Sequence, residues 1–313
     1  MTSPLGWPTM RRRRMGTSGL AVPDLSLGTW MWGSAVTPQD ARDLLTTYLD
    51  AGGNALDTAA GYGRGASETT IGGLLGDVVA RDELVLTTKA GQHDASRRTL
   101  ARELDGSLRR LGTDHVDLFL VQAWSDAAPV EETLATLDWA VTTGRARYVG
   151  VSNYSGWQTG YAASLAARAG SPLVCNQVEY SLLNRLVEDE VVPAAQHLGL
   201  GLAAWSPLGG GVLSGKYRHG IPADSRAASR LFPGFAARSL DAGARRIADA
   251  VVTAAEGLGV SATEVALAWV RDRPGVSTAV LGARTVAQLR TCLAAARLEL
   301  PDELVQALTD VSY

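Results

Sequence analysis

The sequence is short of lysine and cysteine. Of its 29 basic residues only Lys89 and Lys216 are lysines, and the others are arginines. The two cysteines, Cys175 and Cys292, are too few for a disulfide framework, which predicts a reducing, cytoplasmic environment. The chain also lacks a surplus of positive charge, since its net charge is −3. Proteins that bind nucleic acid usually carry a basic surplus, so we expect no nucleic-acid partner.

Long apolar runs and clustered metal ligands are missing as well. No stretch reaches the roughly 18 to 20 apolar residues that a membrane-spanning helix needs, so we expect no membrane partner. The four histidines lack the spacing of a metal site, and we expect no metal. The basic run Arg11–Arg14 is not followed by an apolar segment, which disfavours an export signal. The run is interpreted as an edge strand or hairpin whose arginines face water.

What the chain does contain is one repeated pattern. A short apolar run is followed by a glycine or polar break and then by an amphipathic segment with helical spacing. The apolar runs are continuous, as in strands that are buried on both faces of a parallel sheet. Eight strands are expected, at Leu25–Trp30, Ala55–Ala59, Leu84–Lys89, Val116–Gln122, Tyr148–Asn153, Leu173–Tyr180, Gly201–Pro207 and Ala279–Gly282.

Helices are expected between these strands. Thr37 is a candidate N-cap for the first of them, and another opens at Pro129 and closes at Gly144, which is the usual order of the two residue types. The expected helices are Pro38–Ala51, Ser67–Val79, Arg97–Leu111, Val130–Thr143, Gly156–Ala169, Asp189–Leu198, Leu240–Leu258, Ala262–Asp272, Val286–Ala296 and Asp302–Asp310.

Eight strands that alternate with helices over about 250 residues indicate a (β/α)8 barrel of the α/β class. We expect a short N-terminal hairpin and extra C-terminal helices around a single barrel domain at residues 10–313, preceded by a flexible extension at residues 1–9. A doubly wound sheet is the alternative, but Gly28–Gly33 does not match its glycine fingerprint. The irregular stretch Ser206–Ser239 would be the loop after the seventh strand, where long loops tend to be functional.

Three residues at strand ends form a chemical set. Asp57 ends the second expected strand, Tyr62 follows in the next loop, and Lys89 ends the third strand. Barrel active sites lie at the C-terminal ends of the strands. A buried lysine lowers the pKa of a nearby phenol, and an aspartate keeps that lysine charged. Such a tyrosine exchanges a proton with a substrate oxygen. A purely structural Asp–Lys pair beside a core tyrosine is the alternative, and the shared location favours catalysis.

Two glycine-containing segments predict a phosphate site. The segment Val280–Leu289 runs from a strand through a glycine turn into a helix, and Arg284 stands where it would pair with a phosphate. The segment Ser206–Lys216 is a second glycine-rich loop, and Trp205 before it offers a ring for stacking. Barrels often bind phosphate after strands seven and eight. A tight turn with a solvated arginine and a core tryptophan are the alternatives.

Together these motifs resemble the aldo-keto reductase family, in particular its bacterial branch similar to potassium-channel β subunits. The resemblance covers nearly the whole chain from about Met10 and is carried by ALDTAAGYGRGASE, TTKAG, VDLFLVQ, GRARYVGVSNYSGWQ, NQVEYSLLNR, AWSPLGGGVLSGKY and LGARTVAQL. It implies a (β/α)8 barrel that reduces a small-molecule carbonyl compound with NADPH.

The resemblance also implies roles for single residues. Tyr62 would be the general acid/base that Lys89 and Asp57 tune, and Gln122 stands where the family usually has a catalytic histidine. Residues implied to bind NADPH are Gly28, Thr29, Trp30, Asp57, Ser152, Asn153, Gln177, Trp205, Ser206, Pro207, Leu208, Gly210, Lys216, Gly282, Arg284 and Gln288. Within this set Trp205 would stack on the nicotinamide, whose carboxamide Ser152, Asn153 and Gln177 would hold. Substrate is expected to meet aromatic side chains of Trp30, Trp32, Tyr62, Trp124 and the Phe232–Phe235 region.

Two departures from the family pattern leave the reaction open. Gln122 keeps a hydrogen-bond donor but cannot carry a proton as a histidine does. Near the adenine, Thr291 and Cys292 replace the Glu and Asn that the family often has, which bears on the preference for NADP over NAD. The oligomeric state is open too.

Three functions are therefore considered. The first is reduction of an aldehyde or ketone. The second is reduction of an activated C=C bond, as in an enone, or oxidation of a hydroxyl group. An arginine- and alanine-rich composition fits an actinobacterial source, where such enzymes tailor deoxysugars and other secondary metabolites. The third is a nucleotide-sensing or scaffold protein of the same fold, against which the intact set of Asp57, Tyr62 and Lys89 argues.

Overall fold

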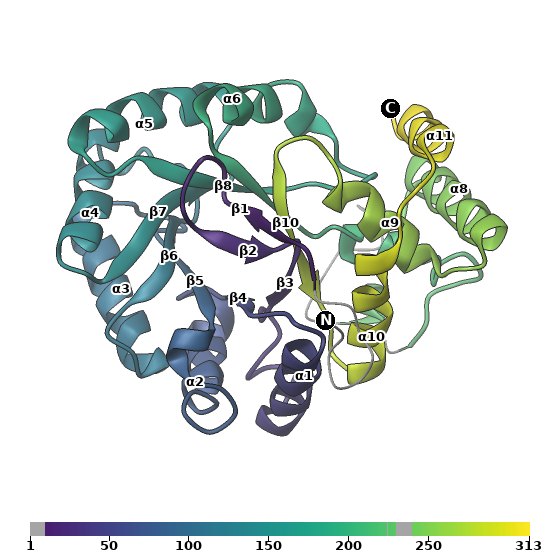
Figure 1. Cartoon of the computed structure of the whole chain (residues 1–313), viewed down its shortest axis with the longest axis horizontal. Coiled ribbons are helices and arrows are strands. Elements are labelled where there is room, and N and C mark those ends of the chain that lie inside the picture. Colours follow the sequence, from purple (N-terminus) through teal and green to yellow (C-terminus); the bar gives the residue numbers. More distant parts are fainter. Residues whose placement is uncertain (1–9, 224, 230–239) are drawn as a thin grey trace.

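The barrel is closed by eight parallel strands. The computed structural model describes residues 10–223, 225–229 and 240–313, so the predictions for residues 1–9 and Phe232–Phe235 fall outside the described residues. Around the barrel the strand order is β10-β3-β4-β5-β6-β7-β8-β9 (Figure 1). The strands are β3 (Leu25–Gly28), β4 (Ala55–Asp57), β5 (Val85–Ala90), β6 (Val116–Val121), β7 (Ala146–Ser152), β8 (Leu173–Glu179), β9 (Gly201–Trp205) and β10 (Val276–Gly282). The predicted (β/α)8 barrel is confirmed.

Helices surround this barrel, and two of them extend it on one side. Figure 1 shows α8 and α11 outside α9 and α10, on the side where the chain ends. The helices are α1 (Pro38–Asp50), α2 (Ala66–Gly72), α3 (Arg97–Leu111), α4 (Val130–Thr142), α5 (Gly156–Ala169), α6 (Val191–Leu198), α8 (Ala242–Leu258), α9 (Ala262–Arg271), α10 (Val286–Ala294) and α11 (Asp302–Val311). Short 3₁₀ helices lie at Tyr62–Gly65, Arg81–Glu83, Leu186–Glu188, Gly209–Ser214, Arg226–Ala228 and Ala295–Arg297.

Local sequence signals account for most helix ends. The hydroxyl of Thr37 accepts a hydrogen bond from the Asp40 amide and caps α1, as the sequence predicts. The predicted helix Ser67–Val79 is wrong in length, because α2 ends at Gly72. A Cβ atom on Gly72 would lie 2.3 Å from the carbonyl oxygen of Arg110, so α3 crosses too close for any other residue there. The helix α2 therefore ends at the residue where it contacts α3.

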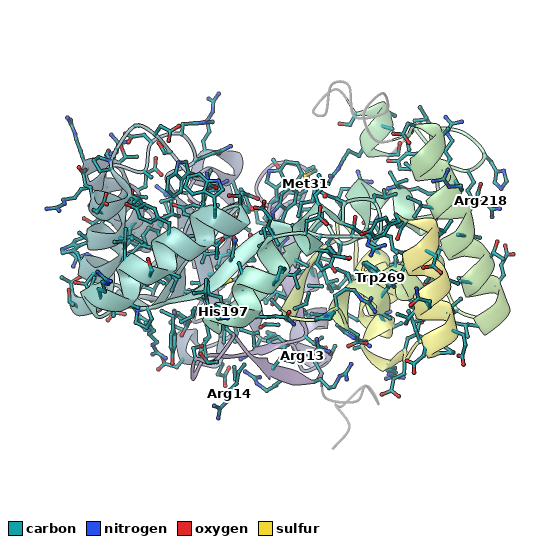
Figure 2. All side chains as sticks on the ribbon, turned by 90° about the horizontal axis from the view of Figure 1, so that it is seen from above. Arg13, Arg14, Met31, His197, Arg218 and Trp269 are labelled. Carbon is teal, nitrogen blue, oxygen red and sulfur yellow. The ribbon has the colours of Figure 1, made fainter. Side chains whose placement is uncertain are left out.

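A hairpin closes the N-terminal end of the barrel. Strands β1 (Arg12–Arg14) and β2 (Ala21–Pro23) pair antiparallel, and Figure 2 shows Arg13 and Arg14 at the opposite end of the molecule from Met31. The hairpin side chains Met15, Leu20 and Val22 share a buried cluster with barrel residues of β6, β8, β9 and β10. This apolar plug fills the lower part of the barrel, so a ligand has access only from the other end.

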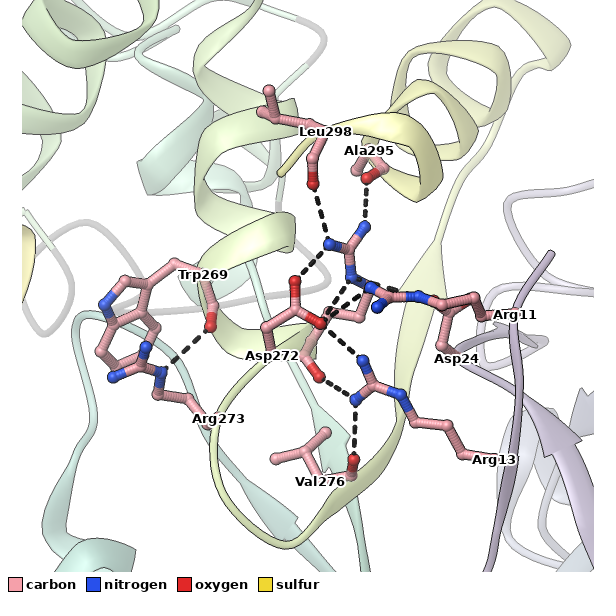
Figure 3. Close-up of polar contacts among 10 residues, drawn as sticks. Arg11, Arg13, Asp24, Trp269, Asp272, Arg273, Val276, Ala295 and Leu298 are labelled. Carbon is pink, nitrogen blue, oxygen red and sulfur yellow. Dashed lines mark hydrogen bonds and ion pairs between the residues drawn. The ribbon is translucent and has the colours of Figure 1, made fainter. Parts of the chain in front are cut away.

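Arginines of the hairpin join a buried ionic cluster (Figure 3). Arg271, which is fully buried at the end of α9, donates hydrogen bonds to the carbonyl oxygens of Ala295 and Leu298 and pairs with Asp272. Arg13 pairs with the same Asp272. The expectation that the arginine run faces water is therefore wrong for Arg13, because the end of α9 supplies a carboxylate beneath β1.

Arg271 is expected to contribute strongly to stability. Replacing it with methionine would leave two carbonyl groups without their charged donor and remove one of the cations near the buried Asp24, whose carboxylate lies 3.8 Å from Arg271. Lost hydrogen bonds of this kind cost about 1–3 kcal/mol each. We expect Arg271→Met to lower the free energy of unfolding in urea by about 2–3 kcal/mol. The exposed Arg14→Met is the control, and equal stability of the two variants would contradict the role.

Candidate active site

The predicted site residues meet in one cavity of about 1480 Å³ at the C-terminal ends of the barrel strands. All four predicted catalytic residues line it, and nearly all predicted cofactor residues do too. The predicted residues found in its lining are Gly28, Trp30, Asp57, Tyr62, Lys89, Gln122, Ser152, Asn153, Gln177, Trp205, Ser206, Pro207, Leu208, Gly210, Lys216, Gly282, Arg284 and Gln288.

A buried ion pair lies at the floor of this cavity. Asp57 stands at the end of β4, and its Oδ1 accepts a hydrogen bond of 2.7 Å from the Nζ atom of Lys89 on the neighbouring strand β5. Its Oδ2 accepts one of 2.7 Å from Nε2 of Gln177 on β8. Both side chains of the pair are almost completely buried. Because each carboxylate oxygen has a donor, the barrel fixes the negative charge and, through it, the ammonium group.

Tyr62 lies directly beside this pair, at the start of the 3₁₀ turn that follows β4. Lys89 Nζ is 5.2 Å from the centre of its ring. Burial raises the pKa of Tyr62 above its ordinary value, although the nearby Lys89 ammonium acts to lower it. The sequence-based expectation of a lowered pKa is therefore wrong in direction for the protein without ligands. A phenol that keeps its proton at neutral pH is suited to donate it.

Lys89 stays charged in spite of its burial. Burial acts to lower the pKa of Lys89, but the Asp57 carboxylate and Tyr62 together outweigh it and raise that pKa above its usual value. A lysine without such partners would release its proton on burial. The ammonium is thus a fixed positive charge next to the phenol, where it stabilises any negative charge that forms on the oxygen after proton transfer.

Side chains from β7, β8 and β9 brace the opposite wall. Asn153 has a left-handed backbone, with φ of +60°, and its Nδ2 donates to the carbonyl oxygen of Gln122. Its Oδ1 accepts a hydrogen bond of 3.0 Å from Nε1 of Trp205. The hydroxyl of Ser152 donates to the carbonyl oxygen of Gln177 at 2.8 Å. The bond to Asn153 fixes the Trp205 ring at the cavity lining, where a stacking partner is needed.

The glycine-rich loop after β9 forms a cradle. Gly210 and Gly211 have left-handed backbones, with φ of +67° and +94°, and Ser206 before them has φ of +52°. A Cβ atom on Gly211 would lie 2.8 Å from Nζ of Lys216, the end of a flexible side chain, so it is the left-handed backbone that favours glycine there. An open cradle that faces an exposed ammonium fits a pyrophosphate group.

The far end of the cavity fits the remaining part of a dinucleotide. Helix α10 starts there, capped by Thr285, and Oε1 of Gln288 accepts a hydrogen bond from the Arg284 amide. Helix N-termini favour anions, and an arginine pairs with phosphate through two parallel hydrogen bonds. The residues present therefore fit a nicotinamide dinucleotide. Thr291 and Cys292 line the same part of the cavity.

Three predicted residues lie outside the cavity lining. Thr29 is buried and hydrogen-bonds the Asp57 carbonyl oxygen at 2.9 Å, so it supports the strand end from behind. Trp32 is fully buried in the core and does not face substrate as expected. Trp124 is half-buried and packs edge-on against Tyr154 and Trp157. The loop after β3 thus directs Trp32 into a packing contact away from the cavity, whereas the expected contact between Trp124 and substrate stays a prediction.

Many lining residues were missed from the sequence, and Arg226 and Gln92 are two of them. Arg226 lies 5.1 Å from the ring of Trp30, which is 45% exposed, and burial lowers the pKa of this arginine. It belongs to the irregular loop after β9, where no periodicity marks a position. Gln92, just after β5, lines the cavity near Gln122, and its only signal was its place beyond a strand end.

Among the residues that the structure describes, no three histidine, cysteine, aspartate or glutamate side chains gather into a possible metal site. Within the same residues no single helix is long and apolar enough to cross a membrane. One pair of helices, α8 and α9, passes that test only when joined across a bend of 103°.

Comparison with known proteins assigns this architecture to a family. The model of the aldo/keto reductase family matches residues 24–312. A probable voltage-gated potassium channel subunit beta of Oryza sativa subsp. japonica is 38% identical over 287 residues, 88% of this chain and 87% of that protein. An L-glyceraldehyde 3-phosphate reductase of Escherichia coli (strain K12) is 33% identical over 329 aligned positions, which cover 100% of this chain and 92% of the relative.

Proposed function

Since the chain belongs to the aldo/keto reductase family and is an oxidoreductase, we propose that it reduces the carbonyl group of an aldehyde or ketone with a hydride from NADPH. The observation that carries this proposal is the buried Asp57–Lys89 pair beside Tyr62, at the floor of a cavity that fits a dinucleotide. The relative named for reducing an aldehyde phosphate supports an aldehyde as substrate.

Each residue has a defined part in this reaction. NADPH, when bound, supplies the hydride to the carbonyl carbon. Tyr62 donates its phenolic proton to the carbonyl oxygen as that oxygen gains charge. The Lys89 ammonium stabilises the resulting phenolate, and Asp57 holds the ammonium in place. The Trp205 ring, braced by Asn153, would be the stacking partner of the nicotinamide.

Gln122 is proposed to hold the carbonyl oxygen. Its backbone is fixed, because its amide donates to the Ala90 carbonyl oxygen at 2.7 Å and its own carbonyl accepts from Asn153. Its side chain lines the cavity and offers an NH₂ donor. A neutral amide polarises an oxygen without moving a proton, which keeps reduction of an activated C=C bond as a second candidate.

The deciding experiment is a panel of substrates. The protein is mixed with NADPH and a matched aldehyde, ketone and enone, and the absorbance at 340 nm is followed. We expect turnover of the aldehyde. Activity on the enone alone would replace the first function with the second. Tight NADPH binding with no turnover would support the nucleotide-sensing alternative and overturn both reductase functions.

Gln122→His is expected to raise the kcat for aldehyde reduction by about tenfold, because an imidazole can donate as an acid where an amide cannot. Binding of NADPH, followed by fluorescence, should stay unchanged. Gln92→His is the matched control, since Gln92 lines the same cavity two residues beyond the end of β5. Equal aldehyde rates in Gln122→His and in the wild type would contradict the proposed role of Gln122.

A further inference from the structure

A second cavity of about 610 Å³ adjoins the catalytic one. It lies between helix α3 and the loops that follow β4 and β5. Gly61, Gln92 and Gln122 line both cavities, and Gly61 directly precedes Tyr62. The two cavities therefore meet at these three residues, next to Tyr62.

Four guanidinium groups line the second cavity, from Arg64, Arg102, Arg109 and Arg110. The two carboxylates in its wall each accept a hydrogen bond from a backbone amide of the segment between β5 and α3. Glu103 accepts a hydrogen bond of 2.9 Å from the Gly91 amide, and Asp94 accepts one of 2.9 Å from the Ser96 amide. The cavity therefore keeps a surplus of positive charge over its two acids.

Arg110 is held rigidly at one wall. Its Nε donates to the fully buried Glu68 at 2.8 Å, and Glu68 in turn accepts from the Thr88 hydroxyl at 2.6 Å. Two glycines make room for the guanidinium: a Cβ on Gly65 would lie 2.6 Å from its Cδ, and one on Gly106 would lie 3.0 Å from its Nη1. This Nη1 atom has no hydrogen-bond partner among the described residues.

The other three arginines are exposed at this cavity, and Arg102 also favours the charged form of Asp94. Within the part of the chain that the structure describes, Arg64, Arg102 and Arg109 form no hydrogen bond and no close ion pair through their side chains. Arg64 has a left-handed backbone, with φ of +57°, a conformation that usually falls to glycine.

We propose that this second cavity is an anion subsite, which binds a phosphate or carboxylate group at the far end of the aldehyde substrate. The proposal deepens the function given above and rests on it. Guanidinium groups suit both anions because their paired N–H donors match the spacing of the oxygens. The arginines would bind the anionic end, while Tyr62 and Gln122 meet the carbonyl oxygen.

Matched substrates test the subsite. Glyceraldehyde 3-phosphate is compared with glyceraldehyde, and succinic semialdehyde with butanal, so the two pairs separate phosphate from carboxylate. We expect a higher kcat/KM for the anionic member of at least one pair. Arg102→Gln, Arg109→Gln and Arg64→Gly should each lower that value about tenfold through KM and leave the neutral aldehyde unaffected. Arg98→Gln on the exposed surface of α3 is the control.

Two outcomes overturn the subsite while the proposed function stands. One is equal kcat/KM for anionic and neutral aldehydes in the wild type. The other is an equal effect of Arg102→Gln and Arg98→Gln on the anionic aldehyde. If no aldehyde is reduced, calorimetric titration with glycerol 3-phosphate and 4-hydroxybutyrate, in saturating NADP⁺, still decides. Binding of either that Arg102→Gln weakens and Arg98→Gln spares supports the subsite, and absence of binding of both rejects it.

Discussion

Tyr62→Phe is expected to lower the kcat for aldehyde reduction by about 10²–10⁴-fold, which is the range that a positioned general acid contributes. The variant keeps the ring that lies 5.2 Å from Lys89 Nζ and loses only the hydroxyl. The cavity walls therefore stay in place, and the dissociation constant of NADPH should not change. Steady-state kinetics and fluorescence titration measure the two quantities separately.

Tyr154→Phe is the matched control, because Tyr154 is buried and packs against Trp124 without lining the cavity. Its kcat should equal that of the wild type.

The pH profile gives a second check. Burial raises the pKa of Tyr62, so the proton needed for reduction stays bound until the pH exceeds about 10, the value of a free tyrosine. Full activity of Tyr62→Phe would remove the central claim about the site.

The barrel could be predicted because its signal is local. A strand such as β6 is buried along its whole length, so its apolar run is unbroken in the sequence. Strand ends were less predictable: β3 stops at Gly28 although the apolar pattern continues to Trp30. The last pairing of β3 is that of Gly28 with Asp57 on β4, and the Thr29 amide completes it by donating to the Asp57 carbonyl oxygen, so the strand end depends on a contact between distant parts of the chain.

The site was predictable as far as it depends on strand ends. Asp57, Lys89 and Gln122 are placed by β4, β5 and β6, and the barrel closure brings them together. Trp32 stands in a loop whose course no periodicity determines, and it turned into a packing contact. The direction of the Tyr62 pKa shift was also beyond the sequence, because it depends on how completely the phenol is buried.

Lys89→Met is expected to reduce both activity and stability. The Oδ1 atom of Asp57 would lose its hydrogen bond from Lys89, while Oδ2 would keep the one from Gln177. Breaking a buried ion pair by removing one partner costs about 3–5 kcal/mol. Urea unfolding should show a loss of this size, and kcat should fall because the phenolate of Tyr62 loses its stabilising charge. Lys216→Met, at an exposed lysine, should leave unfolding unchanged.

The double variant Asp57→Asn/Lys89→Met separates stability from chemistry. Removing both charges leaves no uncompensated ion, so most of the lost unfolding free energy should return while the aldehyde rate stays low. The pH dependence follows the same logic. The folded pKa of Lys89 is raised, so its contribution to stability is complete below about 10.4, the value of a free lysine, and disappears as the pH rises through the folded value.

Lys89→Arg tests whether charge alone is sufficient. Nearly all basic residues of this chain are arginines, yet position 89 is a lysine. Its side chain is only 2% exposed, and its compact ammonium fits between Asp57 and Tyr62. A guanidinium is planar, larger and always charged. We therefore expect Lys89→Arg to fold less stably than the wild type and to reduce aldehydes at about the rate of Lys89→Met. A wild-type kcat in Lys89→Arg would show that position 89 requires a positive charge but not the shape of a lysine side chain.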